Sequence, residues 1–204
     1  AADRQATSRA YVNANGGTFS VLYNSTSGIF GTGDTAVDRV TIFDGGLTID
    51  TQNTGTQSSD TPFVAPTGRG VASIALPANF ANGNYLGAPE IRISGGGGEG
   101  ATAHALYDPL TRSVTNILVT CPGWDYETAP KATICSYDRS VTNECVVTLT
   151  EGDRVGGGLV KTGGNTLTLN AVNTYRGDTV LKGGTLKFGV AGSLPADSTV
   201  VFVN

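Results

Sequence analysis

Acidic side chains and a single histidine are the residues of this 204-residue chain best suited to catalysis. Asp108, Asp125 and Glu127 could supply the two carboxylates that polysaccharide-cleaving enzymes use as an acid and as a base or nucleophile. Their places beside proline and in a glycine-led turn are also typical of solvated, turn-capping groups, which is the simpler explanation. His104 has no nucleophile or orienting partner that the sequence identifies. We therefore expect no enzyme.

Aromatic residues in the same region favour a sugar-binding site over a catalytic one. Tyr85, Tyr107, Trp124 and Tyr126 are candidate platforms for the apolar faces of sugars, and Asp125 could accept hydrogen bonds from sugar hydroxyls. The alternative is that these rings stack within or against the core. Host or matrix glycans are therefore candidate partners.

Neither a metal site nor a cofactor site is expected. A zinc site needs about four ligands, usually in close Cys or His pairs, and the chain has one histidine and no CxxC motif. Asp34, Asp38, Asp44 and Asp50 could offer oxygen atoms to calcium. Their spacing, however, matches neither the EF-hand loop nor the Gly-Gly-x-Gly-x-Asp repeat.

The three cysteines permit one disulfide and leave one thiol over. For an exported protein we favour a bond between Cys135 and Cys145, because the nine residues between them are typical of a loop joining two strands. A bond between Cys121 and Cys135 is the alternative. The remaining cysteine is expected to be a buried small hydrophobe, with an intermolecular link as the alternative.

Composition excludes several classes of protein. Only 15% of residues are charged, 29 are glycine, and the net charge is -4, which argues against a disordered chain and against nucleic acid or an anionic membrane as the main partner. No apolar run approaches the roughly 20 residues that cross a bilayer. The chain begins at Ala1 and contains no methionine, so we interpret it as a mature, processed or excised piece.

Short alternating runs ended by Gly, Asn or Asp predict an all-β protein with little helix. The expected strands are 18–23, 39–43, 47–50, 70–76, 90–94, 113–120, 131–135, 145–150, 166–170, 179–182, 185–188 and 199–203. Their tight spacing suits a sandwich or a solenoid, so internal repeats must decide between the two.

The middle of the chain contains an internal repeat. A strand, a glycine turn, a Tyr-x-x-x-Pro segment and a second strand occur over 71–93 and again over 114–134. Such units are expected to stack as successive coils of a β-solenoid, with Tyr85 and Tyr126 at corresponding positions. Residues 70–135 weakly resemble Gly-rich Tyr-x-x-x-Pro repeats of bacterial surface and phage fibre proteins.

The C-terminal quarter carries a more specific pattern. Residues 158–169 (GLVKTGGNTLTL) are followed by 173–179 (NTYRGDT) and by 183–189 (GGTLKFG). This order, over about 155–204, resembles the passenger-associated, or autotransporter-associated, β-strand repeat. It departs from the usual pattern at Asn170-Ala171 and at Arg176. The resemblance implies an exported right-handed parallel β-helix on a bacterial surface.

We therefore expect a right-handed parallel β-helix, or β-solenoid, with short strands and glycine-rich turns. Its parts would be an N-terminal β region of first coils or cap (1–68), the Tyr-x-x-x-Pro region (69–150) and the autotransporter-associated repeat (151–204), continuous with the same solenoid. The expected role is a secreted or surface-bound structural passenger, or a fibre subunit, with a glycan-binding adhesin or polysaccharide-active module as the alternative.

The last strand is the candidate assembly edge. Thr199, Val200, Val201, Phe202 and Val203 form an apolar run with no charge after Asp197. Open β edges can pair with another chain, so this strand could join further passenger coils or another copy, head to tail.

Overall fold

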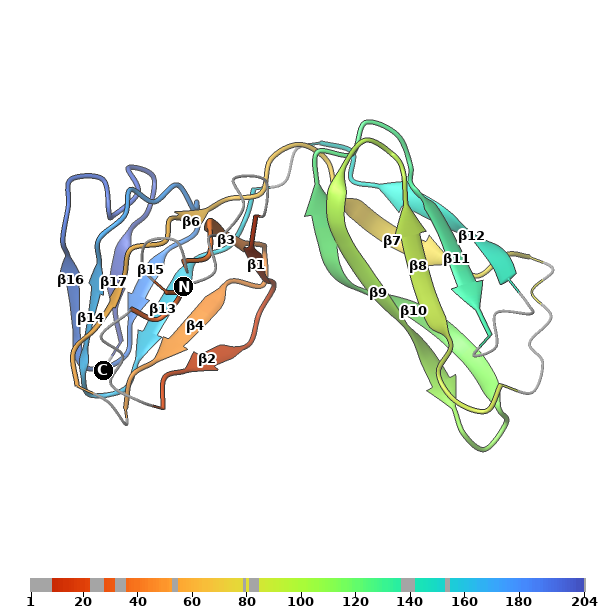
Figure 1. Ribbon diagram of the computed structural model, residues 1–204, viewed down its shortest axis with the longest axis horizontal. Coiled ribbons are helices and arrows are strands. Elements are labelled where there is room, and N and C mark those ends of the chain that lie inside the picture. The colour runs from red at the N-terminus through yellow and green to blue at the C-terminus, as the bar shows by residue number, and fades with distance from the viewer. Residues whose placement is uncertain are drawn as a thin grey trace, which may run out of the picture. The chain divides into compact units, whose positions relative to one another are not determined.

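The computed structural model describes residues 9–22, 28–31, 36–52, 55–78, 80, 85–136, 142–152 and 155–203. These residues form strands and turns and no helix, so none of them belongs to a helix that could span a membrane (Figure 1). The predicted all-β class is confirmed. The chain divides into two units, which we name unit 1 (Ala1–Pro66 with Val155–Asn204) and unit 2 (Thr67–Arg154).

Unit 1 is built from short strands that pair only in parallel. Its sheets have the orders β1-β3-β6, β17-β15-β13-β4-β2 and β16-β14-β5. The strands are β1 (Tyr11–Ala14), β2 (Thr18–Ser20), β3 (Arg39–Ile42), β4 (Leu47–Asp50), β5 (Gln57–Ser59), β6 (Phe63–Val64), β13 (Leu159–Thr162), β14 (Thr166–Leu169), β15 (Thr179–Leu181), β16 (Thr185–Phe188) and β17 (Val200–Phe202).

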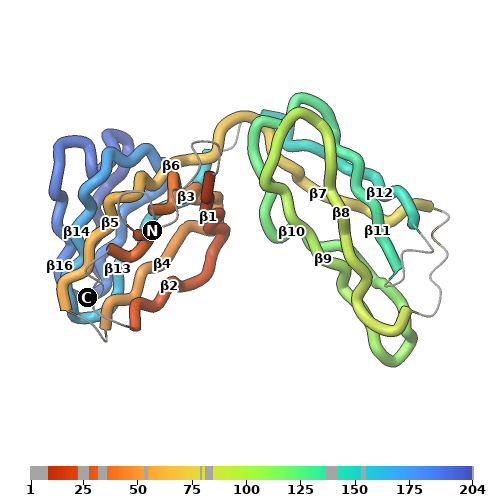
Figure 2. Tube along the Cα trace, in the orientation of Figure 1, coloured from red at the N-terminus to blue at the C-terminus, as the bar shows by residue number. Residues whose placement is uncertain are grey.

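The chain of unit 1 visits its three sheets in turn, and we call one such pass a coil. One coil runs through β3, β4 and β5, and the next through β6, β13 and β14, so that β13 lies on β4 and β14 on β5. Figure 2 shows these early and late segments of the chain side by side. Unit 2 interrupts the second coil between β6 and β13.

The interior of unit 1 follows from strand alternation. Leu47 and Ile49 in β4, and Leu167 and Leu169 in β14, point to one side of their strands and are buried. The tight turn before β16 needs Gly184, whose φ is +70° and where a side chain would collide with backbone atoms of residues 163–165.

Lys161 occupies an inward position of β13, in line with Leu159, and has no exposed surface. Its ammonium group donates to the carbonyls of Thr162 (2.7 Å), Gly163 (2.7 Å) and Gly183 (3.0 Å), so each of its three protons has an acceptor. Because Gly183 belongs to the next coil, the side chain ties two coils together. Burial lowers the pKa of Lys161, and the charge of Asp50 opposes that shift.

Unit 2 consists of two antiparallel sheets around a separate core. The sheets have the orders β7-β12-β11-β8 and β10-β9. The strands are β7 (Val71–Ala75), β8 (Glu90–Ser94), β9 (Glu99–Asp108), β10 (Ser113–Trp124), β11 (Lys131–Cys135) and β12 (Thr142–Leu149). Buried side chains from both sheets, such as Ile74, Ile117 and Ile134, belong to one apolar cluster.

The predicted solenoid coils over 69–150 are therefore wrong. The second strands of the two repeat copies, β8 and β11, are antiparallel neighbours, with Ile91 opposite Ile134. The chain reverses between β8 and β9, where Gly95, Gly96 and Gly97 have positive φ (Figure 1), and again between the antiparallel strands β9 and β10. Tyr85 and Tyr126 consequently do not occupy successive levels of a stack, although both lie in the core of unit 2.

We expect Lys161→Met to lower the free energy of unfolding of unit 1 by about 1–3 kcal/mol, because three carbonyls lose a buried donor. Chemical denaturation measures this, with the exposed Lys182 as a matched Lys182→Met control.

The stability of unit 1 should also depend on pH through Lys161. Between the lowered pKa and the ordinary value of 10.5, the unfolded chain binds more protons than the folded one, so Lys161 makes stability rise with pH. An equal loss in both variants, or the same pH slope with and without Lys161, would contradict this role.

The two cores should also respond separately to truncation. Leu167→Ala should cost unit 1, and Ile134→Ala unit 2, about 2–5 kcal/mol each, because both side chains are fully buried. Differential scanning calorimetry of the full chain should show only one of two transitions move in each variant. A common shift of both transitions would mean that the units unfold together.

Candidate functional site

The predicted sugar-binding aromatics are mostly buried. Tyr85, Trp124 and Tyr126 are 8%, 4% and 4% exposed, and burial raises the pKa of the Tyr85 and Tyr126 hydroxyls. The Tyr107 hydroxyl donates to the Tyr85 carbonyl at 2.6 Å. Trp124 lies so close to Gly100 that a side chain there would collide with its ring. The rings of Tyr85, Trp124 and Tyr126 therefore pack inside unit 2, and none presents an open face for a sugar.

Asp125 and Tyr126 nevertheless line a hollow on unit 2. This open hollow, of about 610 Å³, is bordered by Gly68, Arg69, Asp125, Tyr126, Glu127, Glu151 and Gly152. Asp125 and Glu127 are exposed, Asp125 has a φ of 56°, and Arg69 donates to the Glu127 carbonyl. The hollow thus combines one guanidinium with three carboxylates, groups that hydrogen-bond hydroxyls and amides.

Backbone hydrogen bonds fix the hollow where the chain enters and leaves unit 2. The amides of Asp125 and Tyr126 donate to the carbonyls of Thr67 and Arg69, both at 3.0 Å. The Thr150 amide donates to the Gly70 carbonyl at 2.9 Å. Segments 67–70 and 150–152 are therefore held together beside the end of β10.

Asp108, the remaining acidic candidate, caps a turn. Asp108 accepts from the Thr111 hydroxyl (2.7 Å) and the Leu110 amide (2.9 Å), and these bonds lower the pKa of its carboxyl group. The turn-capping explanation of Asp108 is confirmed. His104 is an exposed residue of β9, paired with Leu118.

The acidic residues considered for calcium also bind backbone amides. Asp38, Asp44 and Asp50 accept from the amides of Ala10, Gly156 and Gln52 at 2.5, 3.2 and 3.0 Å. Asp34 lies outside the described residues. Within the part of the chain that the structure describes, no group of three His, Cys, Asp or Glu side chains could hold a metal ion.

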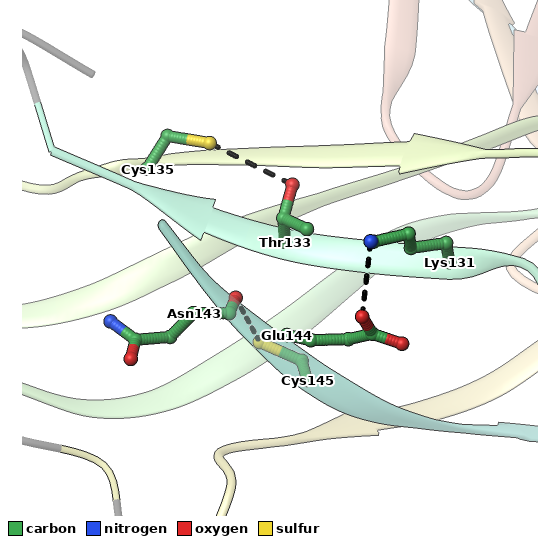
Figure 3. A network of polar contacts seen from close by, with 6 residues as sticks. All are labelled: Lys131, Thr133, Cys135, Asn143, Glu144 and Cys145. Atoms are coloured by element: carbon green, nitrogen blue, oxygen red, sulfur yellow. Dashed lines mark hydrogen bonds and ion pairs between the residues drawn. The ribbon is translucent and has the colours of Figure 1, made fainter. Parts of the chain in front are cut away.

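The favoured disulfide between Cys135 and Cys145 is wrong. In the antiparallel pair β11–β12, Cys145 lies opposite Ala132 and Cys135 opposite Thr142. The two cysteines are thus three residues, about 10 Å, out of register and point to opposite faces, whereas a disulfide needs α-carbons within about 7 Å. In Figure 3 each sulfur faces an atom of its own strand, Thr133 Oγ1 and the Asn143 carbonyl. All three cysteines are buried thiols, so the alternative with Cys121 is not formed either.

The predicted assembly edge is the outer strand of the largest sheet. Val200, Val201 and Phe202 form β17, which pairs with β15 in parallel. The Thr199 carbonyl accepts from Thr179 at 2.8 Å, and the Val203 amide donates to the Leu181 carbonyl at 3.0 Å. Phe202 is 72% exposed and Val203 45%. Among the described residues, no strand pairs with the other side of β17.

Sequence reasoning missed Lys161, Arg69 and Glu151. Lys161 could have been found, because it stands two residues after Leu159, where alternation places it inside. Arg69 and Glu151 come together only through the tertiary fold of unit 2.

Comparison with protein families places the C-terminal segment. The passenger-associated-transport-repeat family model matches residues 159–188, which include β13, β14, β15 and β16. Comparisons with curated proteins and with solved structures gave no significant match. The resemblance of the C-terminal quarter to the autotransporter passenger repeat is therefore confirmed over these residues, and residues 159–188 form a passenger-associated-transport repeat.

Proposed function

We propose that this chain is a structural segment of an exported bacterial surface protein, in which unit 1 is a right-handed parallel β-helix. The observation that carries the proposal is the parallel stacking of the matched repeat on β4 and β5, strands from far earlier in the chain. The repeat thus continues a stack rather than standing alone. Repeats that cannot bury their apolar faces singly stabilise one another by such stacking.

The proposed role is to build and display rather than to catalyse. Unit 2 leaves the stack after β6 and returns before β13, and its ends are tied together at 67–70 and 150–152. A module whose ends lie close together can be carried within a coil without breaking the stack. We propose a secreted or cell-surface location, with further coils or other copies as partners.

Surface delivery tests the proposed function. With residues 1–204 as the passenger of an autotransporter in a Gram-negative host, Leu159→Asp should reduce the amount at the surface several-fold, because it places a charge in the buried stack. The neighbouring Val160, only partly buried, gives Val160→Asp as the matched control. Protease accessibility on intact cells is the measurement. Equal surface amounts for wild type and Leu159→Asp would contradict a role of the stack in export.

A second candidate function is glycan binding at the hollow of unit 2. It is favoured because Asp125 and Tyr126, two of the predicted glycan-binding residues, line that hollow beside Arg69 and Glu151. Since the rings are buried, binding would depend on the polar groups.

For the glycan hypothesis, Asp125→Asn and Glu151→Gln should each weaken retention of a bound glycan about 10-fold, the loss of one charged hydrogen bond. Asn tolerates the positive φ of position 125, so the fold should persist. A glycan array followed by titration is the measurement, with Asp108→Asn at the hairpin turn as control. No retained glycan, or equal retention by all variants, would exclude the hollow.

A further inference from the structure

The two outer strands of the five-stranded sheet in unit 1 are complementary. The sheet is entirely parallel, with β2 at one edge and β17 at the other. Among the described residues, β2 pairs only with β4 and β17 only with β15. A parallel strand offers alternating N–H and C=O groups on both sides, so each outer strand has one row of these groups that no described strand takes up.

The registers align one inward column of side chains through all five strands. That column runs Phe19, Ile49, Lys161, Leu181 and Phe202. Ile49 and Lys161 have no exposed surface, whereas Phe19 is 39% and Phe202 72% exposed. Exposure is therefore greatest at the two ends of the column, at one phenylalanine on each outer strand.

Neither outer strand carries the usual protection of a sheet edge. Natural edges are commonly blunted by charged residues or proline. The segments Thr18-Phe19-Ser20 and Val200-Val201-Phe202-Val203 contain neither. The ring of Phe19 packs on Phe30 at 5.0 Å, which holds it at the end of the core.

We propose that β17 of one copy of this chain adds in parallel to β2 of the next copy, with Phe202 against Phe19 and Val201 beside Thr18. The partner is a second copy because the same contact already occurs four times within the sheet, between β2 and β4, β4 and β13, β13 and β15, and β15 and β17. Strand β17 of a second copy therefore matches β2 in length, in strand direction and in the position of its inward side chain. The contact joins two different surfaces, so repetition produces a filament rather than a closed dimer. This inference rests on the proposed parallel β-helix.

Complementation between two blocked variants tests the docking. Phe202→Asp should block the β17 edge and Phe19→Asp the β2 edge, because each puts a charge into the joined core. The wild-type chain should form concentration-dependent filaments, whereas each variant alone should be monomeric. An equimolar mixture should give dimers and nothing larger, since one good edge of each kind remains. Sedimentation velocity and negative-stain electron microscopy measure this, with Leu110→Asp, at a residue 93% exposed on unit 2, as the control.

Cysteine cross-linking tests the register and serves if Phe19→Asp fails to fold. Under oxidation, Thr18→Cys combined with Val201→Cys should produce a ladder of linked chains. Thr18→Cys with Val203→Cys, two residues out of register, should not. A monomeric wild type, filaments that persist in Phe202→Asp, or equal linking by both cysteine pairs would overturn the docking. The proposed function would still stand if Leu159→Asp lowers surface delivery. That function is contradicted only when surface delivery does not depend on Leu159.

Discussion

The parallel pairing of β13 with β4 is the contact on which the rest of unit 1 depends. It joins Leu159 to Leu47 and Lys161 to Ile49 across the whole of unit 2. Bringing the ends of so long a loop together costs chain entropy, although this cost grows only slowly with loop length. Unit 2 itself holds segments 67–70 and 150–152 together, since the Thr150 amide donates to the Gly70 carbonyl. The inserted unit therefore brings together the two chain ends that must continue one coil.

Buried polar groups inside unit 1 specify the register in which its strands pair. Apolar burial alone would specify that register less strictly. Lys161 joins its own turn to Gly183 of the next coil. Asn173, 4% exposed, accepts from the Phe63 amide at 2.8 Å and donates to the Ser193 carbonyl at 2.6 Å, so it spans the coils on both sides. A slip by two residues would leave these buried groups without partners, which costs about 1–3 kcal/mol for each. Leucines would tolerate such a slip better than these two residues do, because a shift of two residues keeps a leucine on the inner face of its strand.

Local alternation predicted strands, but it could not predict their partners. The strands 47–50, 90–94, 131–135 and 185–188 have the predicted bounds, because apolar and polar residues alternate over them. Strands β1, β5, β6, β9 and β13 were missed. For two of them the reason is local, since Gln57–Ser59 turns polar side chains inward and β9 is rich in small residues. The direction of pairing depends on whether a turn advances or reverses the chain, and the same short strands suit both. In unit 2 the turns that join β8, β9 and β10 reverse the chain, which made the repeat in the middle of the chain misleading. For the candidate site, Asp125 and Tyr126 were among the predicted residues and line the hollow, but the burial of the rings and the approach of Glu151 arise only in the fold.

The two units differ in whether their turns reverse or advance the chain, and therefore in how their sheets end. In unit 2 the chain reverses at each turn, and the described strands close around one core that takes up residues from both sheets. In unit 1 the chain advances by one strand spacing per coil, so the interior column of side chains ends at an outer strand on each side, at Phe19 and at Phe202. An advancing fold gains stability with each added neighbour, whether that neighbour belongs to the same chain or to another. The passenger-associated repeat lies in the advancing unit, where a short sequence pattern can be repeated because each copy meets the same environment as the one before it.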